Sequence, residues 1–156
     1  MKGVYCIRTI VEGVPDMADD FSTDNMLDMY LYENGQLLEQ LEEIVLEDKD
    51  EDSFDENNIN EIFRIMHTIK GSSGVMKYDD IMKTSHKLED IFYFLRENRN
   101  VEEHHMELTE IIFRVLDFIN GEMDKIKDGN DPDGDSSELI ADMEKFLAGL
   151  KDNKQA

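Results

Sequence analysis

Apolar residues recur at intervals of three and four along most of this sequence, which is the spacing that places side chains on one face of an α-helix. The clearest stripe, in residues 59–73, consists of Ile59, Ile62, Phe63, Met66 and Ile69. Similar stripes predict four further helices, over residues 22–46, 79–97, 101–127 and 137–150. Short connections make neighbouring amphipathic helices antiparallel. The sequence therefore predicts an all-α fold, in which an up-down-up-down four-helix bundle carries an additional C-terminal helix.

The two ends of the chain are expected to lie outside this bundle. Residues 1–20 are predicted to be a leader of uncertain order, because the short apolar run at residues 4–7 cannot form a stable strand alone and Pro15 interrupts what precedes it. The helices then make up one domain over residues 21–152, with residues 153–156 as a tail or the start of a linker. Ser22 or Thr23 can cap the start of the first helix, and Ser136 or Ser137 can cap the start of the last.

The chain is strongly acidic. It holds 38 Asp and Glu residues against 16 Lys and Arg, which gives a net charge of −22. Nucleic acids and anionic membrane surfaces would repel such a chain, so neither is expected as a partner, and basic protein surfaces are favoured instead. The single cysteine, Cys6, cannot form an internal disulfide, and no apolar run approaches the length of about 18 residues that crosses a bilayer. We therefore expect a cytoplasmic location.

A lone histidine, His67, lies within the clearest helical stripe. At about 100° per residue it falls about 115° from the centre of the apolar face, so a ring nitrogen can reach solvent at the edge of the core. Gly71 and Gly74 lie near the same angle, and each costs a helix about 1 kcal/mol relative to alanine. Missing side chains beside an exposed imidazole leave room for the surface of another protein. A surface histidine without chemistry, and glycines that mark a helix end, are the alternatives.

The following helix, over residues 79–97, presents a carboxylate at the border of the core. Its inward stripe consists of Ile81, Ser85, Leu88, Phe92 and Leu95. Glu89 lies about 90° to one side of this stripe. If this helix and the one before it form an antiparallel pair, Glu89 can meet the imidazole of His67. A carboxylate in that position orients a histidine.

Residues 67–74 (HTIKGSSG) and 84–90 (TSHKLED) together resemble the phosphotransfer domain of chemotaxis histidine kinases. In that family a His-x-x-Lys-Gly segment is followed, nineteen residues after its phosphorylated histidine, by a second histidine and three residues later by a glutamate. The same offsets separate His67, His86 and Glu89. The resemblance covers residues 20–152. It departs from the family at residues 76–78 (Met-Lys-Tyr), where a small residue and a phenylalanine are common.

The resemblance implies a role for each of four residues, His67, Lys70, His86 and Glu89. His67 would attack the γ-phosphate of ATP through Nε2, while Glu89 accepts a hydrogen bond from Nδ1–H and holds the tautomer. Lys70, one turn away, would balance phosphate charge, and His86 would complete the hydrogen-bond network. Contact with a partner is expected at Arg64, Gly71 and Gly74.

The sequence holds no nucleotide-binding loop, neither G-x-x-x-x-G-K-[ST] nor the Gly-rich loop of a protein kinase. We therefore expect no cofactor and no catalytic activity in this domain alone, and ATP and Mg²⁺ would bind a separate kinase domain. By the resemblance, the partners are that kinase catalytic domain and response regulator receiver domains, whose aspartate receives the phosphoryl group. The isolated domain is expected to be a monomer.

Two other classes of function remain open. A helical bundle that presents histidine and glutamate side chains to one another can bind iron or zinc, here through His67, His86 and Glu89, although the paired Glu-x-x-His motifs of such bundles are missing. A scaffolding bundle without chemistry would explain the helices but not the two glycines. The acidic stretches at residues 47–58 and 128–135 do not fit the calcium-binding EF-hand loop, so no metal site is expected.

Overall fold

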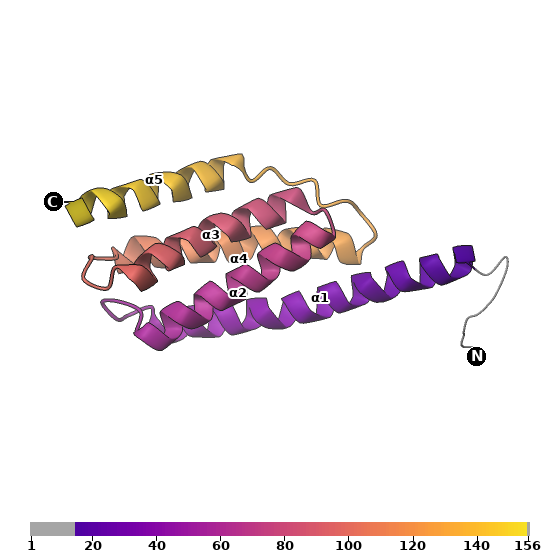
Figure 1. Cartoon of the computed structure of the whole chain (residues 1–156), viewed down its shortest axis with the longest axis horizontal. Coiled ribbons are helices and arrows are strands. Elements are labelled where there is room, and N and C mark those ends of the chain that lie inside the picture. Colours follow the sequence, from indigo (N-terminus) through magenta and orange to yellow (C-terminus); the bar gives the residue numbers. More distant parts are fainter. Residues whose placement is uncertain (1–14, 156) are drawn as a thin grey trace. The chain divides into compact units, whose positions relative to one another are not determined.

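The computed structural model describes the backbone of residues 15–155 and the side chains of residues 24–154. This part of the chain is all-helical, with α1 Pro15–Asp48, α2 Glu56–Val75, α3 Asp79–Glu97, α4 His105–Lys127 and α5 Ser137–Gln155 (Figure 1). None of these described helices is both long and apolar enough to cross a bilayer. The chain divides into two compact units, Met1–Glu33 and Asn34–Ala156. The described part of the first unit is the first half of α1.

The second unit contains the predicted bundle. Successive helices reverse direction, so residues 34–48 of α1 are followed by α2, α3 and α4 in an up-down-up-down order, and α5 reverses once more (Figure 1). α3 packs against α2, α4 and α5, and α4 also packs against α5. α5 is therefore an addition along α3 and α4. The predicted topology, with its additional C-terminal helix, is confirmed.

The apolar stripes form the core of this unit. In α3 all five predicted positions are buried, namely Ile81, Ser85, Leu88, Phe92 and Leu95. In α2 the buried apolar positions are Ile59, Ile62, Ile65, Met66 and Ile69. Each buried aliphatic side chain contributes about 1.5–3 kcal/mol, so these stripes hold the two helices together. Phe63, predicted in the core, is instead half-exposed, because it packs against His67 and Arg96 at the edge of the bundle.

The start of α1 differs from the prediction. The helix begins at Pro15 and not at Ser22 or Thr23. Proline suits the first turn of a helix, because its φ is already helical and its missing N–H would have no partner there. Residues 15–20 of the predicted leader are therefore helical, whereas residues 1–14, with their short apolar run, lie outside the described residues.

Two further helix ends also differ. α4 begins at His105 and not at residue 101, since the backbone of His104 is left-handed, with φ 52°. α5 continues beyond the predicted end at Leu150 to Gln155. Most of the predicted tail is therefore helical.

The start of α5 is tied to α3, and its first N–H bonds to an aspartate side chain where a serine cap was predicted. The Ser136 hydroxyl donates to Asp80 Oδ1 over 2.6 Å, and the N–H of Ser137 donates to Asp135 Oδ1 over 2.9 Å. An aspartate side chain thus accepts from the first N–H of α5. Ser136 instead joins this end of α5 to the first turn of α3.

The turn between α2 and α3 is short and sets their pairing. The N–H of Tyr78 donates to the Ser73 carbonyl over 2.9 Å, and the N–H of Lys77 donates to the Gly74 carbonyl over 3.1 Å. These two bonds form a Schellman helix end, at which glycine is usual in the left-handed position. Lys77 takes that position here, with φ 63°. The chain therefore reverses at once, and the site residues of the two helices come side by side.

Candidate functional site

The predicted histidine and glutamate meet across the α2–α3 pair. Nδ1 of His67 lies within hydrogen-bond distance of Oε2 of Glu89. The His67 side chain is 60% exposed, whereas that of Glu89 is 8% exposed. An ionised carboxylate can only accept, so this contact assigns the ring proton to Nδ1 and leaves Nε2 with its lone pair. The site therefore offers an exposed imidazole with a fixed tautomer and one nucleophilic nitrogen.

Glu89 is also paired with Lys70, which lies one turn after His67 on α2. Nζ of Lys70 is 2.7 Å from Oε1 of Glu89, so each carboxylate oxygen has its own partner. Burial raises the pKa of Glu89, but the hydrogen bonds from Lys70 and His67 outweigh it and hold this pKa below its ordinary value of 4.5. Glu89 is thus ionised at neutral pH although it is buried.

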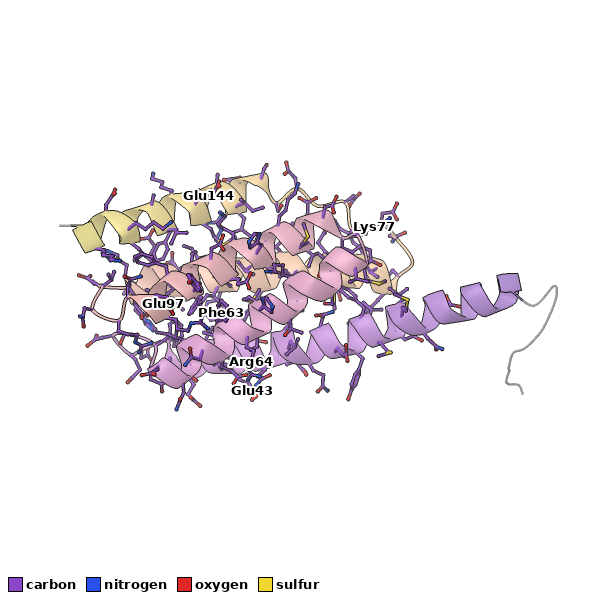
Figure 2. All side chains as sticks on the ribbon, viewed as in Figure 1. Glu43, Phe63, Arg64, Lys77, Glu97 and Glu144 are labelled. Atoms are coloured by element: carbon purple, nitrogen blue, oxygen red, sulfur yellow. The ribbon has the colours of Figure 1, made fainter. Side chains whose placement is uncertain are left out.

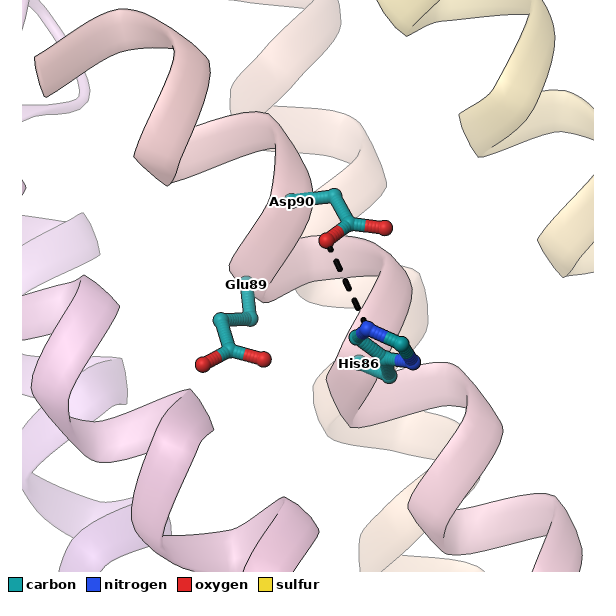
Figure 3. A group of neighbouring side chains, drawn as sticks. All are labelled: His86, Glu89 and Asp90. Atoms are coloured by element: carbon teal, nitrogen blue, oxygen red, sulfur yellow. Dashed lines mark ion pairs between the residues drawn. The ribbon is translucent and has the colours of Figure 1, made fainter. Parts of the chain in front are cut away.

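His86 lies beside Glu89 on α3 and points toward Asp90 (Figure 3). Its Nε2 is 3.6 Å from Oδ1 of Asp90. Among the contacts of the described residues, none joins His86 to His67 or Glu89 by a hydrogen bond. The structure therefore brings His86 next to the site, and its part in the hydrogen-bond network of His67 stays a prediction.

The same three residues of α3 can offer ligand atoms to a cation. One donor atom from each of His86, Glu89 and Asp90 lies within 4.8 Å of the others (Figure 3). Both oxygens of Glu89, however, already face Lys70 and the N–H of His67. A cation would have to displace the Lys70 ammonium or the His67 N–H from the carboxylate. The arrangement therefore favours the orientation of His67 over metal binding.

Arg64, Gly71 and Gly74 lie with His67 along one side of α2, at helical spacings. The side chain of Arg64 is 69% exposed. A Cβ added to Gly71 would meet nothing within 4 Å, and one added to Gly74 would lie 3.4 Å from the Met82 sulfur. The surface beside the imidazole is thus open at Gly71. A partner protein could come close to His67 from this side.

His67 differs from the other three histidines, all of which lie in the described part of the chain. His105 is buried. The carboxylates paired with His86 and His104 are 39% and 79% exposed, so they are free to move away into solvent. His67 therefore combines an exposed ring with a buried carboxylate that has a second partner in Lys70.

The residues of this site lie within a known family of domains. Residues 25–129 match the family model of the Hpt domain. The chain belongs to the Hpt domain family. The match includes α2, α3 and α4, with every residue of the site, and α5 follows it. The family resemblance predicted from the sequence is thereby confirmed.

Curated relatives of this Hpt domain carry the name chemotaxis protein CheA. The protein of Listeria monocytogenes is 30% identical over 125 residues, which cover 80% of this chain and 20% of that protein. That of Bacillus subtilis is 32% identical over 123 residues, covering 76% and 17%, and that of Salmonella typhimurium is 28% identical over 133 residues, covering 85% and 18%. The chain thus spans a fifth or less of the length of these relatives.

An aromatic and cationic cluster beside His67 was not predicted from the sequence of this Hpt domain. The Phe63 ring stacks on that of His67, with centroids 6.0 Å apart, and Arg96 lies over Phe63 at 4.2 Å. Tyr93 borders both. The signal was present, because Phe63 and His67 are four residues apart on a helix and must face each other.

A buried pair of a histidine and a glutamate, His105 and Glu103, was also missed by the sequence analysis. His105 Nδ1 lies 2.5 Å from Glu103 Oε2, and its Nε2 lies 2.7 Å from the Asp48 carbonyl oxygen. The carboxylate of Glu103 also accepts from the N–H of Phe54. Burial raises the pKa of Glu103, and the hydrogen bonds from His105 and Phe54 offset only part of this rise. Both nitrogens of His105 are occupied, so the pair joins two loops and offers no nucleophile.

Proposed function

We propose that this domain is a phosphorelay module of two-component signalling. His67 accepts a phosphoryl group from ATP bound to a separate kinase catalytic domain and passes it to an aspartate of a response regulator receiver domain. The observation that carries the proposal is the arrangement of His67, which is exposed at the surface while its Nδ1–H is held by the buried carboxylate of Glu89. The CheA name of the relatives supports chemotaxis as the setting.

In the first step the lone pair of His67 Nε2 attacks the γ-phosphorus of ATP. The Nε2–P bond forms, the bond from phosphorus to the bridging β–γ oxygen breaks, and its electron pair leaves with ADP. The ring gains positive charge as Nε2 is substituted, and the Nδ1–H group faces an ionised carboxylate that stabilises this charge. Lys70, paired with Glu89, supplies an ammonium one turn from the phosphate.

In the second step a carboxylate oxygen of the receiver aspartate attacks the same phosphorus. The Nε2–P bond breaks and its electron pair returns to Nε2, so His67 is restored in its original tautomer. Because the hydrogen bond to Glu89 keeps the proton on Nδ1 throughout, neither step needs a proton to be added to or removed from the ring. The same contact therefore serves both directions of transfer.

The surface next to His67 suits access by two different partners. Open space lies at Gly71, and the exposed side chain of Arg64 lies on the same side of α2. ATP and Mg²⁺ bind to the kinase domain. The Hpt domain itself acts as a monomer and needs no cofactor. The net charge of −22 supports protein partners over nucleic acid or anionic membranes, and we place the relay in the cytoplasm.

The proposal is tested by incubating the domain with ATP, Mg²⁺ and the catalytic domain of a chemotaxis-type kinase. Intact-mass analysis should show a gain of one phosphate that is lost on acid treatment and absent in His67→Gln. The control is His104→Gln, which changes another exposed histidine and should leave the gain intact. A wild-type domain that gains no phosphate from its cognate kinase, or a gain that persists in His67→Gln, would refute the proposal.

A further inference from the structure

We propose that Phe63 is a positioning residue for His67, and that Arg96 holds Phe63 in place. The inference rests on the proposed function, since it concerns how the phosphoryl acceptor is aimed. Glu89 fixes which nitrogen carries the proton. Phe63 would fix the plane of the ring.

Phe63 and His67 lie against each other on α2. Phe63 lies one helical turn before His67, a spacing at which side chains face each other. The two ring centroids are 6.0 Å apart and the ring planes differ by 16°, so the rings are nearly parallel. Phe63 is half-exposed, although the apolar stripe of its helix is otherwise buried. A phenyl ring thus leaves the core to lie against the acceptor.

α3 supports this ring through Arg96. Arg96 Cζ lies 4.2 Å from the centroid of Phe63 and 5.3 Å from that of Tyr93. A guanidinium group over an aromatic face is attracted by the ring quadrupole. The carboxylate of Glu97, which is labelled with Phe63 in Figure 2, is 3.4 Å from Nε of Arg96. The Phe63 ring is therefore held from the neighbouring helix and is not free to rotate into solvent.

Without the Phe63 ring, the plane of the His67 imidazole would be held only weakly. The hydrogen bond to Glu89 anchors Nδ1 but leaves the ring plane able to rock about that anchor. His67 is 60% exposed, so core packing does little to stop this motion. A parallel ring on one face limits it and sets the direction of the Nε2 lone pair. Phosphoryl transfer depends on that direction, because the attacking nitrogen, the phosphorus and the leaving oxygen must be in line.

The kinetic test separates positioning from docking. Phe63→Leu removes the ring at similar volume, Phe63→Tyr keeps it, and Phe118→Leu on α4 is the matched control for a half-buried phenyl ring. With the kinase catalytic domain, Phe63→Leu should lower kcat for phosphorylation about tenfold at unchanged KM. Phe63→Tyr and Phe118→Leu should keep the wild-type rate, and Arg96→Met should lower kcat by a smaller factor, about threefold. Urea unfolding establishes that each variant is folded.

A second measurement needs no kinase. NMR of the unphosphorylated domain should show a lower order parameter for the His67 Cε1–H bond in Phe63→Leu, while the nitrogen shifts still report the Nδ1–H tautomer. An unchanged order parameter would overturn the proposal, as would a rise in KM at constant kcat, which would make Phe63 part of a docking surface. If the wild-type domain accepts no phosphate, the proposed function fails and the order parameter alone decides whether Phe63 positions the ring.

Discussion

Glu89 is the residue that links stability and chemistry in this domain. It is buried, yet its two oxygens are satisfied by different partners, Lys70 on one and His67 on the other. An unpaired carboxylate at this depth would be costly, so Lys70 stabilises the charge that His67 needs. The lysine therefore contributes to the tautomer of His67 even without touching phosphate.

We predict that the stabilising contribution of Glu89 is lost in acid. Its pKa lies below 4.5 in the folded domain, so at moderately acidic pH the unfolded chain binds more protons and stability rises with pH across this window. The contribution is complete above the unfolded value and disappears as the pH falls through the folded value. Urea unfolding should be measured for the wild type and for Glu89→Gln from about pH 6 to about pH 3. The difference between their free energies of unfolding should shrink as the pH falls.

The control for this measurement is Asp90→Asn, which removes a half-exposed carboxylate from the same helix. Both variants lose one negative charge, so the general effect of acid on so acidic a chain is matched. A gap for Glu89→Gln that stays constant over the pH range would contradict the role assigned to the Glu89 pairs.

At the scale of the helix, Gly71 makes α2 less stable than alanine would and leaves the surface beside it open. Gly71 is exposed, and a side chain there would meet nothing within 4 Å. Gly71→Ala should therefore raise the free energy of unfolding by about 1 kcal/mol, as alanine does in a helix interior. If Gly71 is kept open for a partner, the same change should slow phosphorylation by the kinase domain.

Gly121 on α4 is the matched control for this substitution. It is also exposed within a helix, with nothing within 4 Å of an added Cβ. Gly121→Ala should give a similar gain in stability by thermal or urea unfolding and no loss of phosphorylation. Equal phosphorylation of both variants would show that the kinase does not need the space at Gly71.

The turn from α2 to α3 yields a further prediction. Lys77 has φ 63° in a position where glycine is free of strain. Lys77→Gly should raise the free energy of unfolding by about 1 kcal/mol, since the relief of strain exceeds the added entropy of the unfolded chain. Urea unfolding measures this, and a loss of stability would show that the lysine side chain makes a compensating contact.

Periodicity was enough to predict the helices and the pairing of His67 with Glu89, because both follow from which residues share a helix face. The ends of helices depend on single backbone angles, as at His104, and those angles have no periodic signal. Phe63 was misplaced for another reason. Its position on the apolar stripe is correct, but its neighbours, Arg96 among them, come from a different helix and are known only once α2 and α3 are paired.

At the scale of the whole molecule, charge is distributed unevenly. α1 contains eleven Asp and Glu residues and no Lys or Arg, whereas Glu56–Glu97 contains six basic residues against seven acidic ones. A chain with net charge −22 would repel ATP over much of its surface. By the proposed function α2 and α3 approach ATP, and the segment that contains them is nearly neutral.

The buried pair of Glu103 and His105 joins the loop after α1 to the loop before α4. Removing one member leaves the other buried without its partner, so Glu103→Ala should lower the free energy of unfolding by about 3 kcal/mol. The neighbouring Glu102→Ala, whose carboxylate is 79% exposed, should change it by less than about 0.5 kcal/mol. Urea unfolding of both variants checks this, and equal effects would show that the pair adds nothing to stability.

The most direct test of how this domain works is to find which atom carries the phosphate. Phosphorylated domain labelled with nitrogen-15 can be examined by NMR through the coupling between phosphorus and the ring nitrogens. Because Glu89 holds the proton on Nδ1, we predict that the phosphorus is bonded to Nε2 of His67 and that Nδ1 keeps its proton. Phosphate on Nδ1 of His67, or on any other residue, would contradict the assignment of His67 as an acceptor oriented by Glu89.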